Sequence, residues 1–371
     1  MNNDLIYRIA ISLVPGIGDV HARALINQFG DAKSVFHVPA SKLEKLEGIG
    51  RQRASAIRKF SDFKRCESEI RFMEKHSVQP LFFRDKAFPN RLLQAYDCPV
   101  MLYYLGNANL NHARIISVVG TRNSDEYGKT LCEKLITDLA THDVLIMSGL
   151  AYGIDSVAHR KALTTGLPTV AALAHGLDRI YPWKNKSMAA QMVKQGGLVT
   201  DFLSGTPPDR QNFPRRNRIV AGMCDGLVVI QSGEKGGSLI TAEIANGYDR
   251  EVFAFPGAAD NPKSVGCHRL VMQHKAALIT SAADLLESMG WNDPSANKQV
   301  EQTFLFPPLT EDEIMIMRAL QDQVTDIDRL KYSTGLNQGR LAAALLNLEM
   351  QSLVKTLPGK KFQLERGLPS I

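Results

Sequence analysis

The middle of the chain alternates short apolar runs with amphipathic stretches. Continuous Val/Ile/Leu runs separated by helical patterns are typical of parallel strands that are buried on both faces. We therefore predict a doubly wound α/β domain, in which ligands bind beyond the carboxyl ends of the strands. The predicted strands are residues 115–119, 144–147, 168–174, 227–230 and 251–255, and the predicted helices among them are 127–140, 154–165 and 238–247.

The front of the chain is helical and contains a repeated turn. Gly-Ile-Gly occurs at residues 16–18 and 48–50, 32 residues apart, and a helical pattern follows each turn. This arrangement resembles a tandem helix-hairpin-helix, in which glycines let backbone N–H groups approach a phosphate. The alternative to phosphate binding stays open: in it the glycines serve only to form tight turns between helices, with the Ile17 and Ile49 side chains in the core. Cationic side chains follow the second turn, namely Arg51, Arg53, Arg58 and Lys59.

The end of the chain predicts a small winged helix. A helix at 311–321 and a helix-turn-helix over 327–350 precede two short strands, which flank Pro-Gly-Lys-Lys at 358–361. Winged helices place the second helix of this motif in a DNA major groove. Here that helix carries only Arg340 as a cation, so we expect protein interaction or dimer support rather than duplex binding.

Charge and composition narrow the choice of partners. The chain has 371 residues, 44% of them hydrophobic and 22% charged, which excludes a disordered chain. Its net charge of +6 permits nucleic acid as a partner. The excess is +5 over residues 1–110, +2 over 111–290 and −1 over 291–371. An anion site in the middle segment therefore requires local clustering of cations.

The sequence carries no sign of a membrane, metal or disulfide. It lacks an apolar run long enough to span a bilayer, and its start does not read as a secretion signal. The five cysteines are scattered and form no CxxC pair. We expect a cytoplasmic protein without a metal or a cofactor.

Several loops at the predicted strand ends share one chemistry. They combine glycines and hydroxyls with arginines, and helix N-termini follow them. The loops are Gly120–Ser124, Ser148–Asp155, Phe213–Gly222 and Gly233–Glu243. Neither GxGxxG after the first strand nor GxxxxGK[ST] is present, so a dinucleotide or Walker-type site is not supported. This rim is wider than one mononucleotide requires, and repeated phosphates on a strand would suit it.

The order of these loops closely resembles the DNA-processing protein A family (DprA, also called Smf) over residues 75–290. The shared motifs are Gly-Thr-Arg, Ser-Gly-Leu-Ala-Tyr-Gly-Ile-Asp-Ser-Val-Ala-His, Phe-Pro-Arg-Arg-Asn-Arg-Ile-Val-Ala-Gly and Gly-Gly-Ser-Leu-Ile-Thr-Ala. The resemblance implies an extended Rossmann-like domain that binds single-stranded DNA. It also implies that the protein forms a homodimer and that it protects incoming DNA in natural transformation and loads the RecA recombinase onto it. No catalysis is established for the family.

Carried onto this sequence, the resemblance places the DNA-binding residues in these loops. They are Gly120, Thr121, Arg122, Ser148, Gly149, Lys184, Phe213, Arg215, Asn217, Arg218, Gly237, Ser238, Thr241 and Ala242. If a helix begins near the arginine run, Arg215 and Arg218 share a face at i, i+3, and Arg216 points away. We therefore expect the first two, and not Arg216, to contact the ligand.

Two positions depart from the family pattern. Gln231 stands at or near the place where members commonly carry a Glu before the glycine-rich loop. A later loop, usually Gly-x-Asn or similar, reads Val-Gly-Cys-His at 265–268. Both departures concern individual contacts rather than the resemblance as a whole.

The sequence divides into four parts under this interpretation. These are a helix-hairpin-helix region at 1–75, the Rossmann-like domain at 76–291, a polar linker at 292–308 and a winged-helix domain at 309–371.

Two other functions remain open. Gly-Gly-x-x-Thr-x-x-Glu at 236–243 resembles a loop of nucleotide phosphoribohydrolases of the lysine-decarboxylase-like group, in which the Glu acts on a ribose. Glu243 could act so only if it faces the ligand rim. The other alternative is a regulator that binds duplex DNA through the winged helix.

Overall fold

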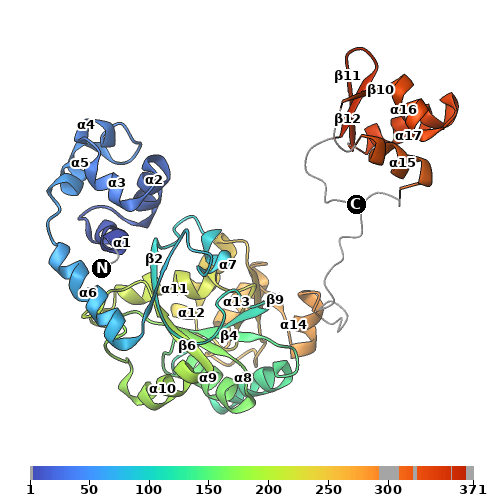
Figure 1. Cartoon of the computed structure of the whole chain (residues 1–371). Coiled ribbons are helices and arrows are strands. Elements are labelled where there is room, and N and C mark those ends of the chain that lie inside the picture. The colour runs from blue at the N-terminus through green and yellow to red at the C-terminus, as the bar shows by residue number, and fades with distance from the viewer. Residues whose placement is uncertain (1–2, 292–308, 321–323, 352, 365–371) are drawn as a thin grey trace. The chain divides into compact units, whose positions relative to one another are not determined.

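The structure is a computed structural model that describes residues 3–291, 309–320, 324–351 and 353–364. It divides into two compact units, Met1–Asn292 and Asp293–Ile371 (Figure 1). The predicted linker at 292–308 lies outside the described residues. So do residues 321–323, 352 and 365–371, which belong to the predicted winged-helix region.

Helices form the first part of the first unit. Their bounds are α1 (Asn3–Leu13), α2 (Asp19–Phe29), α3 (Ala32–His37), α4 (Ala40–Leu43), α5 (Gly50–Lys59) and α6 (Phe63–His76). The two Gly-Ile-Gly turns precede α2 and α5, and their isoleucines, Ile17 and Ile49, are buried. Arg53 joins the turns, since its Nε donates to the Gly16 carbonyl at 2.8 Å and its Nη1 donates to the Gly48 carbonyl.

A mixed sheet forms the centre of the first unit. Within the described residues it has nine strands in the order β1-β2-β6-β5-β4-β3-β7-β8-β9. Their bounds are β1 (Gln79–Phe82), β2 (Met101–Gly106), β3 (Ile115–Val119), β4 (Leu145–Ser148), β5 (Thr169–Ala172), β6 (Gly196–Thr200), β7 (Gly226–Val229), β8 (Glu251–Ala254) and β9 (Ala277–Leu278). The strands from β6 to β9 in this order are parallel, as predicted for the middle of the chain.

The edge of the sheet differs from the predicted parallel arrangement. β2 pairs antiparallel with β6, and β1 pairs antiparallel with β2. β1, β2 and β6 are not among the strands predicted from the sequence. β6 begins with Gly196-Gly197, and glycine is depleted in strands.

Helices cover both faces of the sheet (Figure 1). On one face Ile116 and Val118 pack with residues of α8 (Glu126–Leu139), α9 (Ile154–Thr165) and α14 (Ala282–Ser288). On the other face the alternate residues Ile115 and Val119 share a cluster with α11 (Asn212–Gly222), α12 (Gly237–Gly247) and α13 (Val265–Met272). The period of two places consecutive side chains on opposite faces, so the strands are buried on both.

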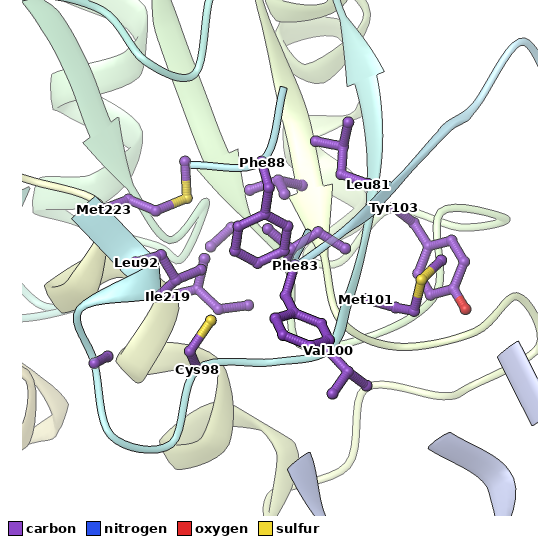
Figure 2. Packing of buried hydrophobic residues seen from close by; sticks show 14 of the residues in the cluster. Leu81, Phe83, Phe88, Leu92, Cys98, Val100, Met101, Tyr103, Ile219 and Met223 are labelled. Atoms are coloured by element: carbon purple, nitrogen blue, oxygen red, sulfur yellow. The ribbon is translucent and has the colours of Figure 1, made fainter. Parts of the chain in front are cut away.

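The segment between β1 and β2 packs beneath α11. It contains α7 (Asn90–Leu93), and Figure 2 shows Phe88 and Leu92 beside Ile219 and Met223 of the α11 end. Phe88 and Leu92 are fully buried. This packing fixes α11, whose first turns carry the arginine run.

The second unit has its own core. Its elements are α15 (Glu311–Ala319), β10 (Thr325–Asp326), α16 (Ile327–Thr334), α17 (Gln338–Met350), β11 (Val354–Leu357) and β12 (Lys361–Leu364). The strands form a sheet in the order β10-β12-β11, and Leu330, Leu341 and Leu348 are buried together. In the described parts of both units, no helix has the length and apolar character that a membrane crossing requires.

Candidate nucleic-acid interface

An open cleft of about 540 Å³ lies where β3, β4 and β7 end at their carboxyl edge. β4 leads to one side of the sheet and β7 to the other, so the cleft occupies the point at which the strand order reverses. This is the place where doubly wound sheets bind ligands. The cleft brings together nine of the predicted residues, namely Gly120, Thr121, Arg122, Gly149, Phe213, Asn217, Gly237, Ser238 and Thr241.

Three exposed cations line the cleft. Arg122 follows β3, Arg210 precedes α11, and Lys235 lies in the glycine-rich loop before α12. Among the described residues, none of the three has a carboxylate partner. Their charges are therefore available to an anion.

Aromatic rings adjoin these cations. The Tyr181 and Phe213 ring centroids are 6.0 Å apart, and the Arg122 guanidinium lies 5.3 Å from the Phe213 centroid. Tyr152 and Tyr181 line the same recess and are 45% and 47% exposed. Flat rings beside cations can stack on bases while the cations contact phosphates.

Arg216 points into the cleft, which corrects the prediction that it points away. It is 5% exposed, and its Nη1 donates to the Gly149 carbonyl and, at 2.5 Å, to the Ala172 carbonyl. Burial lowers the pKa of its guanidinium to about 10, although Asp155 opposes that shift. A Cβ on Gly149 would lie 2.4 Å from Nη1, so only glycine leaves room for this side chain.

Asp155 is the acidic residue that lines the cleft in the described structure. It is buried in the first turn of α9 and accepts from the Ala151 N–H at 3.3 Å. Burial raises the pKa of its carboxyl, and Arg216 opposes that rise. The charges of Asp155 and Arg216 thus oppose each other inside the cleft, while its exposed cations have no carboxylate partner in the part of the chain that the structure describes.

Arg215 and Arg218 lie outside this cleft. They line a groove between α11 and the first Gly-Ile-Gly turn. Arg218 forms ion pairs with Asp19 at 2.8 Å and Asp201 at 2.6 Å, and it also donates to the Asp97 carbonyl. Arg215 lies 5.2 Å from the Phe202 ring centroid. The sequence expectation placed both arginines at the ligand rim, but α11 turns that side toward the helical region.

The structure separates three more predicted residues from the cleft. Ser148 is fully buried and donates to the Val118 carbonyl at 2.6 Å. Ala242 is fully buried in α12. Lys184 lines a different groove, between α9 and α10.

The start of α12 supplies backbone donors to the cleft. Gly236 is the N-cap residue, and no side chain caps this helix. The hydroxyls expected here are engaged internally, since Thr241 Oγ1 donates to the Gly237 carbonyl at 2.8 Å and Ser238 Oγ lies 2.9 Å from Ser232 Oγ. The uncapped N–H groups and the helix dipole, rather than these hydroxyls, therefore favour an anion.

Gln231, one of the departures from the family pattern, ties two loops together. Its Nε2 lies 2.9 Å from each carboxylate oxygen of Asp125, and its backbone carbonyl accepts from the Thr121 N–H at 2.8 Å. Asp125 in turn caps α8 by accepting from the Gly128 N–H. At the other departure Cys267 is buried, and His268 lies 3.1 Å from the Gly257 carbonyl.

Glu243 does not face the cleft. It lines the groove that holds Arg215 and Arg218, and its Oε1 lies 2.6 Å from Lys275 Nζ. The alternative nucleotide-processing function required this carboxylate at the ligand rim, and the described geometry does not provide it there.

Two of the four cations that follow the second Gly-Ile-Gly turn are engaged in internal hydrogen bonds. Arg53 donates to both turns, and Arg58 donates to the Phe36 carbonyl. Asp19, just after the first turn, accepts from the Val100 N–H at 3.0 Å and pairs with Arg218. In the described part of the chain Arg51 and Lys59 are left without a side-chain partner. The first turn therefore serves to join the helical region to the sheet.

The cation of α17 in the second unit is also paired. Arg340 Nε and Nη2 contact the two carboxylate oxygens of Asp312 at 2.8 and 2.6 Å. This bidentate pair neutralises the charge that duplex binding through this helix would use.

Three cationic residues of the cleft, Arg210, Arg216 and Lys235, are not among the site residues predicted from the sequence. Lys235 was visible inside the glycine-rich loop, and Arg210 stands three residues before Phe213. Arg216 was excluded because the spacing of arginines does not show which side of α11 meets the sheet. Val220, four residues on, marks that side, since its carbonyl accepts from Ser117 of β3 at 2.6 Å.

Comparison with known proteins gives matches for both units. Residues 79–290 match the model of DNA recombination-mediator protein A, and residues 304–360 match that of the DprA winged helix domain. Protein Smf of Synechocystis is 31% identical, with 98% of this chain and 99% of that protein covered. Protein Smf of Escherichia coli is 34% identical, with 82% of each chain covered.

Two solved structures are similar to this chain. The X-ray structure of DNA processing protein A from Streptococcus pneumoniae has a TM-score of 0.66 and 31% identity, covering 77% of this chain and 98% of that one. The same protein from Helicobacter pylori, described for its single-stranded DNA binding mode, has a TM-score of 0.52 and 25% identity. That match covers 57% of this chain and 95% of that one.

Proposed function

Because the chain belongs to the DNA recombination-mediator protein A family, we propose that it binds single-stranded DNA in the cleft at the β3–β4–β7 edge. In this proposal binding is independent of sequence and protects the incoming strand. The protein then loads the RecA recombinase onto that strand during natural transformation or recombination. The proposal assigns no catalytic step to the chain.

One observation carries the proposal. Arg122, Arg210 and Lys235 bring three positive charges, without a carboxylate partner among the described residues, to a cleft whose own acid, Asp155, lies near the positive charge of Arg216. The adjoining Tyr181 and Phe213 rings favour a single strand, because only unpaired bases expose their faces for stacking. The backbone N–H groups at the start of α12 add hydrogen-bond donors that can contact phosphates, which carry no sequence information.

We propose RecA and a second copy of the chain as partners because of the family membership. RecA loading is the role implied for the family, and a homodimer is its implied assembly. Assembly of RecA on a strand coated by this protein, against the same strand without it, tests the first. Sedimentation of the full chain tests the second, since a monomer at all concentrations would contradict it.

Binding itself is tested by fluorescence anisotropy over a salt series. A labelled strand of ~30 nucleotides is compared with the matching duplex. We expect tight binding of the single strand, weak binding of the duplex, and a slope of log K against log salt of about 0.7 per phosphate neutralised.

Variants connect this binding to the cleft. Arg122→Ala and Arg210→Ala should each flatten the salt slope, whereas Arg71→Ala on the exposed side of α6 should not. Unchanged affinity in both cleft variants would remove the cleft as the binding site. Equal affinity for single strand and duplex would contradict the proposed preference.

A further inference from the structure

A second groove lies between α9 and α10 (Lys186–Gln195), with a volume of about 680 Å³. Arg160 of α9, Lys194 of α10 and Lys184 of the short helix η1 (Trp183–Asn185) contribute its charges. The other lining side chains in the described structure are neutral, and none is acidic. The groove is therefore open and positively charged.

The charge of this groove is not neutralised by its surroundings. Arg160, Lys184 and Lys194 are exposed, and within the described residues none has an ion pair or side-chain hydrogen bond. Residues 156–200 contain six Lys or Arg and a single acidic residue, Asp178. That carboxylate is already engaged by Arg179 at 2.8 Å and by the Gly205 N–H at 2.7 Å. A cluster of this kind attracts a polyanion.

The chain itself connects this groove to the cleft. Tyr181 and Pro182 line the recess beside Phe213, and Lys184 lines the groove. Three Cα–Cα steps separate Tyr181 from Lys184, which limits the span to about 11 Å. Between them Trp183 is 69% exposed, with Lys186 Nζ 4.3 Å from its ring centroid.

We propose that the α9–α10 groove is a second phosphate-binding segment, along which a single strand held in the cleft continues. The strand crosses the exposed faces of Tyr181 and Trp183, and its phosphates then meet Lys184, Arg160 and Lys194. The exposed aromatics at the crossing favour nucleic acid over an acidic protein surface, because they offer stacking to bases. This inference rests on the proposed function of the cleft.

The test uses strand length to separate the two segments. The triple variant Arg160→Ala/Lys184→Ala/Lys194→Ala is compared with the native chain on labelled oligothymidylates of about 6 and about 30 nucleotides. We expect unchanged affinity for the short strand, which in this proposal occupies the cleft alone. For the long strand we expect about tenfold or greater weakening and a salt slope shallower by about 2, for three phosphates.

A control with the same charge change is Lys64→Ala/Arg71→Ala/Lys75→Ala on α6, where all three side chains are exposed. This control variant should leave the affinity for strands of both lengths unchanged. Arg122→Ala should weaken both lengths, and its failure to do so would contradict the proposed cleft function itself. If Arg122→Ala weakens both but the groove variant changes neither the affinity nor the slope for the long strand, the groove inference alone is overturned. Equal weakening of both lengths by the groove variant would also overturn it.

Trp183 supplies an independent readout. The chain has two tryptophans, so Trp291→Phe leaves Trp183 as the single indole. The long strand should quench its fluorescence, and the short strand should not. Absence of quenching by a bound long strand would contradict the proposed path.

Discussion

Arg215 and Arg216 are neighbours in the sequence, yet their guanidinium groups meet different surroundings. Arg216 is buried against the Gly149 and Ala172 carbonyls beside Asp155, whereas Arg215 is exposed over Phe202. The difference arises from the 100° rotation per helical residue, which turns consecutive side chains to different sides. At this scale, position on α11 rather than residue type decides the role.

Arg216→Met should destabilise the protein by about 3–5 kcal/mol, because it leaves the buried Gly149 and Ala172 carbonyls without their donor and removes the positive charge near the buried Asp155. Arg215→Met, the matched change one residue away, should cost less than about 1 kcal/mol. Urea unfolding of both variants measures the difference. Similar free energies of unfolding for the two would contradict the burial of Arg216.

His159 makes stability depend on pH. It is fully buried, with Nδ1 2.7 Å from Thr169 Oγ1, and burial lowers the pKa of its imidazole to about 3 from 6.5. The folded state therefore resists protonation that the unfolded state accepts below pH 6.5. The contribution of neutral His159 to the stability is complete above pH 6.5 and is lost as the pH falls from there toward the pKa of the folded state. At about pH 5 the loss is about 2 kcal/mol.

His159→Asn should remove this part of the pH dependence, since an amide can retain the contact with Thr169 and does not titrate. Urea unfolding at about pH 7.5 and about pH 5 checks it, and the drop in stability should be about 2 kcal/mol smaller than in the native chain. The exposed His76→Asn is the control. An undiminished drop in the His159 variant would count against a buried neutral imidazole.

At the scale of elements, the cleft depends on packing far from it. α11 rests on the segment between β1 and β2, where Phe88 and Leu92 meet Ile219 and Met223 (Figure 2). Arg218 adds polar ties from the same helix to Asp19 and Asp201. The antiparallel edge of the sheet thus helps to hold the helix that carries Arg216 and Phe213.

Phe88→Ala should cost about 3–5 kcal/mol, because it leaves a cavity under α11. Tyr96→Ala in the same segment is the control, since Tyr96 is 74% exposed and should cost less than about 1 kcal/mol. Thermal or urea unfolding measures both. A small effect at Phe88 would mean that this segment can collapse without disturbing α11.

Local pattern predicted the central elements well and the periphery less well. The helix at 154–165 and the strand at 115–119 have the bounds that periodicity gave, because both carry continuous apolar patterns. β6 was missed since its first two residues are glycines, and β9 has only two residues. The side of α11 that carries Arg216 could not be predicted, because it depends on contacts with Ser117 and Gly149 far along the chain.

At the scale of the whole molecule, the two units hold separate cores. The clusters around the nine-stranded sheet involve residues up to 291, and those of the second unit begin at 309 in the described chain. The candidate cleft and the α9–α10 groove both belong to the first unit.

Removal of residues 309–371 should therefore leave single-strand affinity within about threefold of the full chain, a change below about 1 kcal/mol. Anisotropy on the ~30-nucleotide strand measures it. Loss of binding on truncation would instead support DNA contact through the winged helix. Arg340→Ala in the full chain would then test the paired cation of α17 directly.

Alkylation of the buried cysteines can report when the first unit opens. All five lie between residues 66 and 267 and are buried and unpaired, and burial raises the pKa of thiols such as Cys98, to about 12. A thiol that is both covered and protonated reacts only after its surroundings open. The rate of alkylation in the intact chain therefore measures exposure of buried parts of the first unit alone, since the second unit contains no cysteine. Slower alkylation in the presence of a bound strand would show that DNA makes opening of the first unit less frequent.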